Sequence, residues 1–319
     1  MKTLQHPNYA LIGVAGYIAP RHLKAMSDTN GQLIAAYDIN DSVGIMDSHF
    51  PRAAFFTEFE QFSSHMSSLR STDNYVDLLS ICSPNYLHHS HIGYGLRAGM
   101  DVICEKPLVL NLEHLDELKK IEVETGQRVN SILQLRLHKA ILDLKAEVAA
   151  GPADKVYDVD LSYFTSRGAW YHASWKGFTH KSGGIAANIG VHFFDMLNFV
   201  FGPLRMSAVH HRGEDSAAGY LEFKQARVRW VLSINSEHLP SHTPKGQRTY
   251  RSISVNGNEV EFSDGFTELH SDSYKQIIAG HGFGLDVVRP SIELVSSIRT
   301  APIDPKIGEA HFLLSQVQG

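Results

Sequence analysis

The residues best suited to chemistry are an acid and an amine that follow a short apolar run. Residues 102–104 are apolar, and Glu105, Lys106 and Pro107 come directly after them. Such a run is typical of a buried parallel strand, whose functional groups gather at its carboxyl end. Pro107 has no N–H and favours an extended conformation at Lys106, so the strand ends there. A lysine fixed at this edge can meet a substrate; the competing interpretation is a solvated Glu105–Lys106 pair.

A second set of polar residues interrupts the apolar stretch 186–201. Asn188, His192 and Asp195 have the spacing i, i+4 and i+7, which puts them on one face of a helix. Glycines at 183–184 would let a ligand approach closely. His192 is the type of side chain that serves as a general base near neutral pH. The alternative is a core histidine whose hydrogen bonds are satisfied within the protein.

The stretch 166–177 combines aromatic and cationic side chains. Arg167 and Lys176 could make charge-assisted hydrogen bonds to an anionic sugar nucleotide, and aromatic residues such as Tyr171 could stack on it. A surface loop or a subunit contact explains the same composition equally well. Tyr250, which lies among arginines, is a second and less specific candidate for phosphate contact.

Residues 13–19 lie between the first expected strand and the first expected helix, where a dinucleotide-binding fingerprint belongs. Gly13 and Gly16 are present, whereas Ala15 and Ala19 replace glycines. Gly16 would let the backbone approach a pyrophosphate, and the helix N-terminus would supply N–H donors. An ordinary strand–helix turn is the alternative.

Further polar residues end the neighbouring strands. Asp38 follows Gly16 by 22 residues (38 − 16), where an acid binds the adenosine ribose and repels a 2′-phosphate, so NAD is favoured over NADP. Ser83 and Asn85 end another strand and can bond a ribose or a carboxamide, and His88 opens the next helix. Turn chemistry alone explains these last residues equally well.

The elements that must hold these residues follow one another in two different patterns along the sequence. Strands alternate with helices up to residue 133, which predicts a mostly parallel Rossmann sheet. The strands are expected at 9–14, 33–38, 53–56, 76–81, 102–104 and 128–133. Later strands follow one another, at 155–165, 206–211, 219–224, 227–235 and 249–261. We therefore expect a Rossmann domain over 1–133 and, over 134–319, an α+β domain with a mostly antiparallel open sheet and terminal helices at 271–279 and 286–300.

Composition excludes several classes of protein. The sequence has 319 residues, 43% hydrophobic and 20% charged, which is ordinary for a soluble chain of about two domains. The net charge of −5 and the lack of a basic run argue against nucleic acid or membrane as a partner. The polar start, 1–8, predicts no signal peptide, and no stretch approaches the ~18 apolar residues of a membrane span. We therefore expect a cytoplasmic protein, with Cys82 and Cys104 as buried free thiols. The 19 histidines are scattered without metal-ligand spacing, so no metal is expected.

Together these motifs resemble the glucose-fructose oxidoreductase/inositol dehydrogenase (Gfo/Idh/MocA) family. The matching segments are the nucleotide turn with His22, Ser83-Pro84-Asn85 with His88, Glu105-Lys106-Pro107, and Gly183-Gly184 with Gly190-x-His192-x-x-Asp195. Two features depart from the family pattern. The glycine fingerprint is eroded, and Asn188 stands where many members have aspartate. Asn188 can orient His192 but supplies no charge, which makes Lys106 a stronger contender for the base.

Within this family, the chain is most similar to bacterial enzymes that oxidise the C3 hydroxyl of UDP-N-acetylglucosaminuronic acid. Those enzymes act on the route to 2,3-diacetamido uronic acids of surface polysaccharide (O-antigen). The resemblance implies the same reaction with NAD, with 2-oxoglutarate as a candidate for recycling NADH, and a homodimer or tetramer built through the second sheet. The alternatives are a non-catalytic sensor of NAD and a sugar nucleotide, and a dehydrogenase of another sugar or inositol.

The resemblance also implies the site residues, none of which is a metal ligand. Lys106 and His192 are the candidates for catalysis. The cofactor residues are Gly13, Ala15, Gly16, Tyr17, Ile18, Asp38, Asn40, Ser83, Asn85, His88, Glu105 (near the nicotinamide ribose), Lys106, Gln134 and Trp175. The substrate residues are Lys106, Arg167, Tyr171, Lys176, Asn188, His192 and Tyr250.

Overall fold

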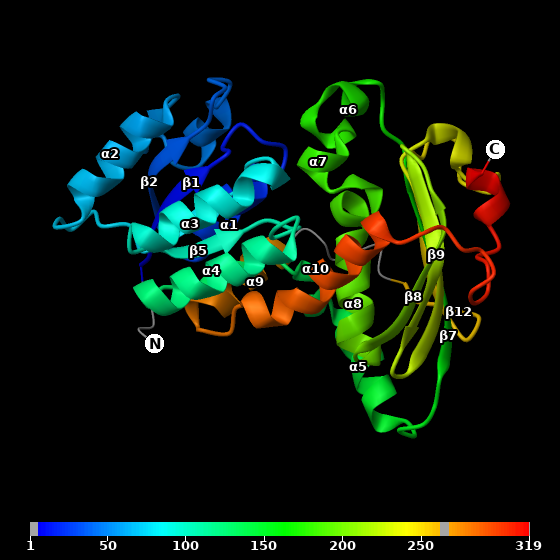
Figure 1. Ribbon diagram of the computed structural model, residues 1–319. Helices are drawn as coiled ribbons and strands as arrows, with labels where there is room; N and C mark the ends of the chain where they lie inside the picture. Colours follow the sequence, from blue (N-terminus) through cyan, green and yellow to red (C-terminus); the bar gives the residue numbers. More distant parts are fainter. Residues whose placement is uncertain (1–5, 262–267, 319) are drawn as a thin grey trace. The chain divides into compact units, whose positions relative to one another are not determined.

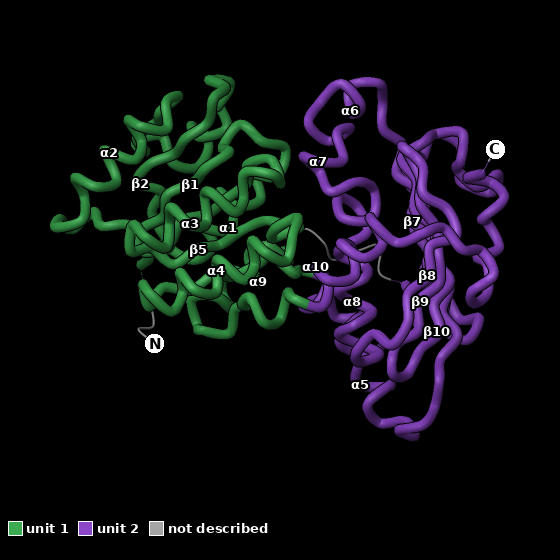
Figure 2. Tube along the Cα trace, in the orientation of Figure 1, with its two compact units in different colours: residues 1–134, 267–289 green, residues 135–266, 290–319 purple. Residues whose placement is uncertain are grey.

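A computed structural model describes residues 6–261 and 268–318 of the chain. The chain divides into two compact units, one of residues 1–134 and 267–289 and the other of residues 135–266 and 290–319 (Figure 2). The first unit takes in 267–289, which the sequence predicts to be part of the second domain. The reason is packing, because the helix in this segment lies against the first helix of the chain. Residues 1–5 lie outside the described residues. They belong to the polar start of the chain, for which we expect no signal peptide.

The sheet of the first unit has six parallel strands in the order β3-β2-β1-β4-β5-β6. The strands are β1 (Asn8–Ile12), β2 (Gln32–Tyr37), β3 (Ala54–Phe56), β4 (Leu78–Ile81), β5 (Asp101–Cys104) and β6 (Val129–Ser131). Every residue of β4 is buried, as expected for a strand that is covered on both faces. The order reverses between β1 and β4, where sheets of this type bind ligands at their carboxyl edge. The predicted Rossmann sheet is confirmed.

Helices cover this sheet, with α1 beside α9 and α3 beside α4. Those that lie wholly in the first unit are α1 (Ala19–Asp28), η1 (Gly44–Ser48), α2 (Phe59–Leu69), η2 (Asn85–Leu87), α3 (His88–Arg97), α4 (Leu112–Thr125) and α9 (Leu269–Ile278). Two helices cross from one unit to the other, η3 (Gln134–Leu137) and α10 (Leu285–Thr300). Residues 44–48 form a 3₁₀ helix within the helical stretch expected near 43–49.

The second sheet has the order β12-β11-β7-β10-β9-β8. Its strands are β7 (Tyr157–Thr165), β8 (Leu204–Arg212), β9 (Ser216–Phe223), β10 (Ala226–Ser233), β11 (Thr249–Val255) and β12 (Asn258–Glu259). Only the β7–β10 pair of this sheet is parallel. The predicted mostly antiparallel sheet is therefore confirmed.

Helix α8 runs along one face of this sheet, and the C-terminal segment lies against the other (Figure 1). On the outer face, Val317 packs with Phe164 and Val231. The elements of this unit are α5 (Lys139–Ala150), α6 (Trp170–Ala173), η4 (Trp175–Gly177), α7 (Thr179–Ser182), the π-helix η5 (Ala186–Gly190), α8 (Val191–Phe201), η6 (Ser236–His238) and η7 (Leu314–Val317).

The segment Thr179–Phe201 is long and apolar enough to cross a membrane, with a mean hydropathy of 1.3 over 18 residues. The sequence reading expects no such stretch. In the structure, 72% of this window is buried. A helix that is apolar all round is typical of a protein core as well as of a membrane, and the burial here matches the core.

Candidate active site

Glu105 and Lys106 follow β5 at the carboxyl edge of the first sheet, as predicted. Glu105 is buried and Lys106 is half-buried. The Lys106–Pro107 peptide bond is cis. The backbone N–H of Lys106 donates a hydrogen bond to Oε2 of Glu105 at 3.2 Å, so the carboxylate holds the start of the lysine-bearing turn.

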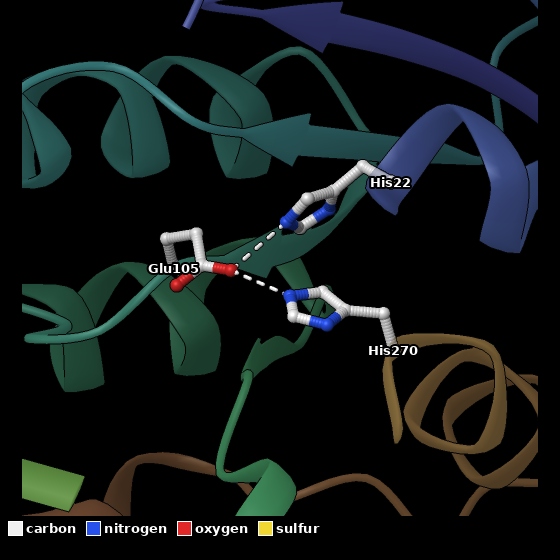
Figure 3. A group of neighbouring side chains, drawn as sticks. All are labelled: His22, Glu105 and His270. Atoms are coloured by element: carbon white, nitrogen blue, oxygen red, sulfur yellow. Dashed lines mark hydrogen bonds and ion pairs between the residues drawn. The ribbon is translucent and has the colours of Figure 1, made fainter. Parts of the chain in front are cut away.

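Two imidazole rings hold the other carboxylate oxygen of Glu105. Nε2 of His22 and Nε2 of His270 each lie 3.0 Å from Oε1 (Figure 3). Both rings are buried, and they come from α1 and α9. Burial raises the pKa of Glu105, but the two hydrogen bonds outweigh it and hold that pKa well below its ordinary value. Glu105 is therefore an ionised carboxylate, although its side chain is almost completely buried.

The hydrogen bonds continue beyond His22 into the sheet. Nδ1 of His22 lies 2.8 Å from the hydroxyl of Tyr274, which lies 2.7 Å from Oγ of Ser80. Our sequence reading missed His270, Tyr274 and Ser80. Two signals were present: His270 and Tyr274 lie one helical turn apart, and Ser80 is a polar residue inside an apolar strand.

His22, Glu105 and His270 are residue types that bind metals, and their ligand atoms lie within 4.8 Å of one another. Both imidazole nitrogens point at the same oxygen, however (Figure 3). Around an ion, the ligand atoms would point at the metal instead. The arrangement is that of two N–H donors on one carboxylate oxygen.

His88 makes hydrogen bonds to two turns at the carboxyl edge of the first sheet. Its Nδ1 lies 2.8 Å from the carbonyl oxygen of Pro107, and its Nε2 lies 2.9 Å from that of Ser83. The ring is fully buried. His88 therefore contacts the backbone of these turns through both of its ring nitrogens. The hydroxyl of Ser83 lies 2.9 Å from Nδ1 of His91, and Asn85 is likewise buried.

The turn after β1 comes very close to the end of β4. Gly13 has φ +89°, and a Cβ on it would lie 2.6 Å from the Cys82 backbone. Only glycine fits such a place without strain. The N–H of Gly16 donates to the carbonyl of Gly13 at 3.0 Å, which closes the turn before α1.

Asp38 is joined to this turn through one carboxylate oxygen and to its own loop after β2 through the other. Oδ2 accepts from the backbone of Ala15 and Oδ1 from that of Asn40, each at 2.9 Å. A carboxylate has roughly four lone-pair sites, so Asp38 keeps acceptors for ribose hydroxyls. Beside it, Tyr17 and Ile39 expose 91% and 83% of their surface, as apolar walls for an adenine would.

These residues fit a dinucleotide at two further points. Within the part of the chain that the structure describes, the backbone N–H groups of Tyr17 and Ile18 have no acceptor, as in a turn that binds a pyrophosphate. Gln134 follows β6, next to the strand that carries Glu105. Its Oε1 is buried and has no hydrogen-bond partner among the described residues, and a carboxamide N–H would satisfy it.

Predicted substrate residues gather in the second unit. Nδ2 of Asn188 donates to the hydroxyl of Tyr171 at 2.6 Å. Burial raises the pKa of Tyr171, while the nearby charge of Arg167 opposes the rise. Burial and the same arginine lower the pKa of Lys176. The Lys176 ammonium lies 4.4 Å from the ring centroid of Trp175, so this group combines two cations with aromatic faces.

In the structure, Asn188, His192 and Asp195 do not share one regular helix face as predicted, because Asn188 lies in a different element from the other two and their surroundings differ. Asn188 lies in a π-helix, whereas His192 is half-buried in α8. A π turn changes the angle between successive side chains and is common at functional sites. Asp195 is buried and makes two hydrogen bonds of 2.8 Å with Arg136. It therefore belongs to a structural ion pair within the unit.

Tyr250 does not join the Tyr171–Asn188 group. It lies on β11 with its ring against Phe164, in the cluster that contains the C-terminal segment. Its neighbour Arg251 points the other way, with its guanidinium 5.5 Å from the ring centroid of Tyr163. Successive strand residues face opposite sides, so Tyr250 and Arg251 lie on opposite faces of the sheet.

Sequence comparison places the chain among known oxidoreductases. A family model described as "Oxidoreductase family, NAD-binding Rossmann fold" matches residues 7–132, and one described as "Oxidoreductase family, C-terminal alpha/beta domain" matches residues 145–306. D-glucoside 3-dehydrogenase of Escherichia coli is 26% identical over 185 residues, which cover 49% of this chain and 51% of that protein. Alignments with the first curated relatives span about half of those proteins, between 40% and 60%.

Two solved structures are similar over nearly the whole chain. The WlbA (WbpB) dehydrogenase of Thermus thermophilus, in complex with NAD and UDP-GlcNAcA, superposes with a TM-score of 0.92 at 47% identity, covering 97% of this chain and 100% of that one. The same enzyme with NAD and alpha-ketoglutarate gives a TM-score of 0.92 at 48% identity, with 96% and 99% covered. The two family matches and this similarity agree with the nucleotide turn and the second sheet. The chain therefore belongs to the Gfo/Idh/MocA oxidoreductase family, with an NAD-binding Rossmann fold in its N-terminal part.

Proposed function

We propose that this protein oxidises the C3 hydroxyl of UDP-N-acetylglucosaminuronic acid to the 3-keto sugar, with NAD as cofactor. One observation carries the proposal. Over 97% of its length, the chain is 47% identical to a dehydrogenase whose structure contains both NAD and UDP-GlcNAcA. The other relatives include sugar and inositol dehydrogenases, which supports the same type of reaction.

The first unit binds the cofactor through residues of its carboxyl edge. The N–H groups of Tyr17 and Ile18 bind the pyrophosphate, Asp38 binds the adenosine ribose, and Gln134 accepts a hydrogen bond from the carboxamide. NAD, when bound, supplies the acceptor for the hydride that leaves C3. The exposure of Tyr17 and the buried, unpaired Oε1 of Gln134 support this assignment.

The second unit binds the anionic sugar nucleotide. Arg167 and Lys176 pair with its phosphates or its carboxylate, and Trp175 supplies an aromatic face, with Lys176 4.4 Å from the ring centroid. Burial lowers the pKa of Lys176. An anion beside it favours the charged form, so binding of the substrate and protonation of Lys176 reinforce each other.

Oxidation of an alcohol also releases the hydroxyl proton, and two residues are candidates to accept it. Lys106 as a neutral amine, or His192 as a neutral imidazole, takes this proton while the C3 carbonyl forms. If His192 is the base, the Lys106 ammonium stabilises the negative charge that develops on the oxygen. Asn188 and Tyr171, joined by a hydrogen bond of 2.6 Å, orient the sugar.

Several further features belong to the same proposal. 2-Oxoglutarate recycles NADH on the enzyme, which is supported by the Thermus structure with NAD and alpha-ketoglutarate. The reaction takes place in the cytoplasm, and its product is a precursor of the 2,3-diacetamido uronic acids of O-antigen. The protein is a homo-oligomer, dimer or tetramer, built through the second sheet, and light scattering distinguishes the two.

The test is turnover of the purified protein with UDP-GlcNAcA and NAD, with and without 2-oxoglutarate. Mass spectrometry should detect a product that has lost two hydrogens, and 2-oxoglutarate should be reduced in proportion if it recycles NADH. UDP-GlcNAc, which lacks the carboxylate, and free inositol are the control substrates. Binding of UDP-GlcNAcA without a keto product under either condition would support the sensor alternative and refute the reaction.

A further inference from the structure

The chain brings a histidine from near its C-terminal end to the catalytic edge of the first sheet. His270 lies in α9, and its Nε2 is 3.0 Å from Oε1 of Glu105. The side chain is buried, and its ring stands edge-on to that of His22, with centroids 5.1 Å apart (Figure 3). Glu105 is therefore held from two helices that are far apart in the sequence.

The contacts of Glu105 determine where the protons are. A protonated carboxyl has one hydrogen, which can serve only one of the two rings on Oε1. An ionised carboxylate accepts from both rings at Oε1 and from the Lys106 N–H at Oε2. In the ionised form all three donors make charge-assisted hydrogen bonds, the stronger kind, with each ring donating from Nε2, and the lowered pKa of Glu105 agrees with this form.

The remaining ring nitrogens agree with neutral imidazoles. Nδ1 of His22 can accept from the Tyr274 hydroxyl, which in turn can accept from Ser80. Nδ1 of His270 has no partner among the described residues. Burial lowers the pKa of His22, in the same direction. Glu105 thus carries a negative charge that is held by hydrogen bonds from neutral rings and a backbone amide.

We propose that His270 and His22 are positioning residues, which keep Glu105 ionised and fixed so that its bond to the Lys106 backbone sets the catalytic lysine in place. The effect on turnover rests on the proposed function, because it assumes that Lys106 takes part in the reaction. The fixed carboxylate does not depend on that assumption. His270 acts only through Glu105 and touches neither the substrate nor the cofactor.

The decisive comparison is His270→Phe with His270→Gln. Phenylalanine fills the space without a donor, whereas glutamine keeps an N–H near the position of Nε2. We expect His270→Phe to lower kcat by about ten- to a hundredfold, the loss that follows from a misplaced catalytic group, with little change in KM. His270→Gln should stay within a few-fold of the wild type. His281→Phe, at an exposed position just after α9, is the matched control and should change neither constant.

The pH profile separates positioning from a general loss of structure. Without one donor the pKa of Glu105 rises, so on acidification His270→Phe should lose more activity than the wild type does at the same pH. Tyr274→Phe keeps the ring and removes the hydroxyl that faces His22, and it should show the same change more weakly. This variant carries the test if His270→Phe fails to fold. Equal profiles for all variants, or equal losses for glutamine and phenylalanine at position 270, would overturn the proposal.

A measurement without substrate keeps the two proposals distinguishable. Carbon-13 NMR of the Glu105 carboxyl, assigned with Glu105→Gln, should show an ionised group in the wild type at pH values where an ordinary glutamate is protonated. In His270→Phe the same carboxyl should titrate closer to the ordinary range. If UDP-GlcNAcA is not oxidised but this shift is found, the reaction is wrong and the positioning stands. An ordinary titration in the wild type would refute the positioning.

Discussion

Glu105 and Lys106 are neighbours in the chain but have different surroundings. Glu105 exposes 6% of its surface and accepts hydrogen bonds from two imidazoles, whereas Lys106 is half-buried. Consecutive residues of an extended segment face opposite sides, which separates the two side chains. The acid thus lies in the protein interior, and Lys106 is the more exposed residue of the pair.

Lys106→Met and His192→Asn test the two candidates for proton transfer. Each should lower kcat by about two to four orders of magnitude, the usual contribution of general acid–base catalysis. The melting temperature of both variants should stay close to that of the wild type, and His192→Asn should also keep its NAD affinity, because His192 is not among the cofactor residues. Rates near the wild-type value in either variant would remove that residue from the mechanism.

Glu105→Gln should change the response of stability to acid. The pKa of Glu105 in the folded protein lies well below 4.5, its ordinary value. Its ionised form therefore adds stability that is complete above about pH 4.5 and is lost as the pH falls through the lower folded pKa. At neutral pH, glutamine should lower the free energy of unfolding by about 1.5–3 kcal/mol, the contribution of hydrogen bonds to a charged group.

Denaturant unfolding of wild type and Glu105→Gln at several pH values measures this difference. The gap between the two proteins should narrow once the pH falls below about 4.5. A gap that stays constant on acidification would mean that the carboxylate contributes no charge-dependent stability.

At the scale of elements, turns decide which side chains reach the site. The sequence predicts every strand of the first sheet, because apolar runs and glycines mark them clearly. It predicts one helix over 186–201, where the structure has a π-helix followed by α8. A π turn depends on how the segment packs and has no periodicity of its own. The spacing of Asn188 and His192 therefore could not be derived from a regular helix.

Gly13→Ala tests the turn between β1 and α1. A Cβ at this position would lie 2.6 Å from the Cys82 backbone, and φ is +89°, so the turn must shift. Strain of this type costs about 1–3 kcal/mol. We expect NAD affinity to fall at least about tenfold, since 1.4 kcal/mol is a factor of ten, with a lower melting temperature.

Gly44→Ala is the matched control, because a Cβ there would meet nothing within 4 Å. Calorimetric titration with NAD measures both variants. An unchanged NAD affinity in Gly13→Ala would show that the turn tolerates a side chain and does not bind the pyrophosphate closely.

At the scale of the whole molecule, the first unit is assembled from two parts of the sequence. Residues 267–289 belong to it, although nothing in their composition distinguishes them from the helices of the second unit. The residues that join α9 to the unit are spread over both parts, among them Tyr274, which packs in the core that contains Leu23 and Met26. Single-sequence patterns report local periodicity, so the spacing of His270 and Tyr274 could indicate a shared helix face but not the pairing of that face with α1 and Glu105.

A fragment of residues 1–134 alone should therefore fail to form the nucleotide-binding unit. Without α9, the apolar side of α1 and the carboxylate of Glu105 become exposed to solvent. Near-ultraviolet circular dichroism and NAD titration should show neither fixed aromatic packing nor binding. The same fragment joined by a flexible linker to residues 267–289 should regain both. NAD binding by the fragment 1–134 itself would contradict this prediction.

The origin of His270 in a late segment also sets the order of events during synthesis. His270 is made 165 residues after Glu105 (270 − 105), which takes roughly 8 to 33 s at about 5–20 residues per second on the ribosome. For most of that interval, once β6 (Val129–Ser131) has been made, the nascent chain carries all six strands of the first sheet, and Glu105 has at most one of its two imidazole donors. The first unit is therefore completed only when most of the second has been translated, and a ribosome that stalls between them releases a chain without a finished cofactor site.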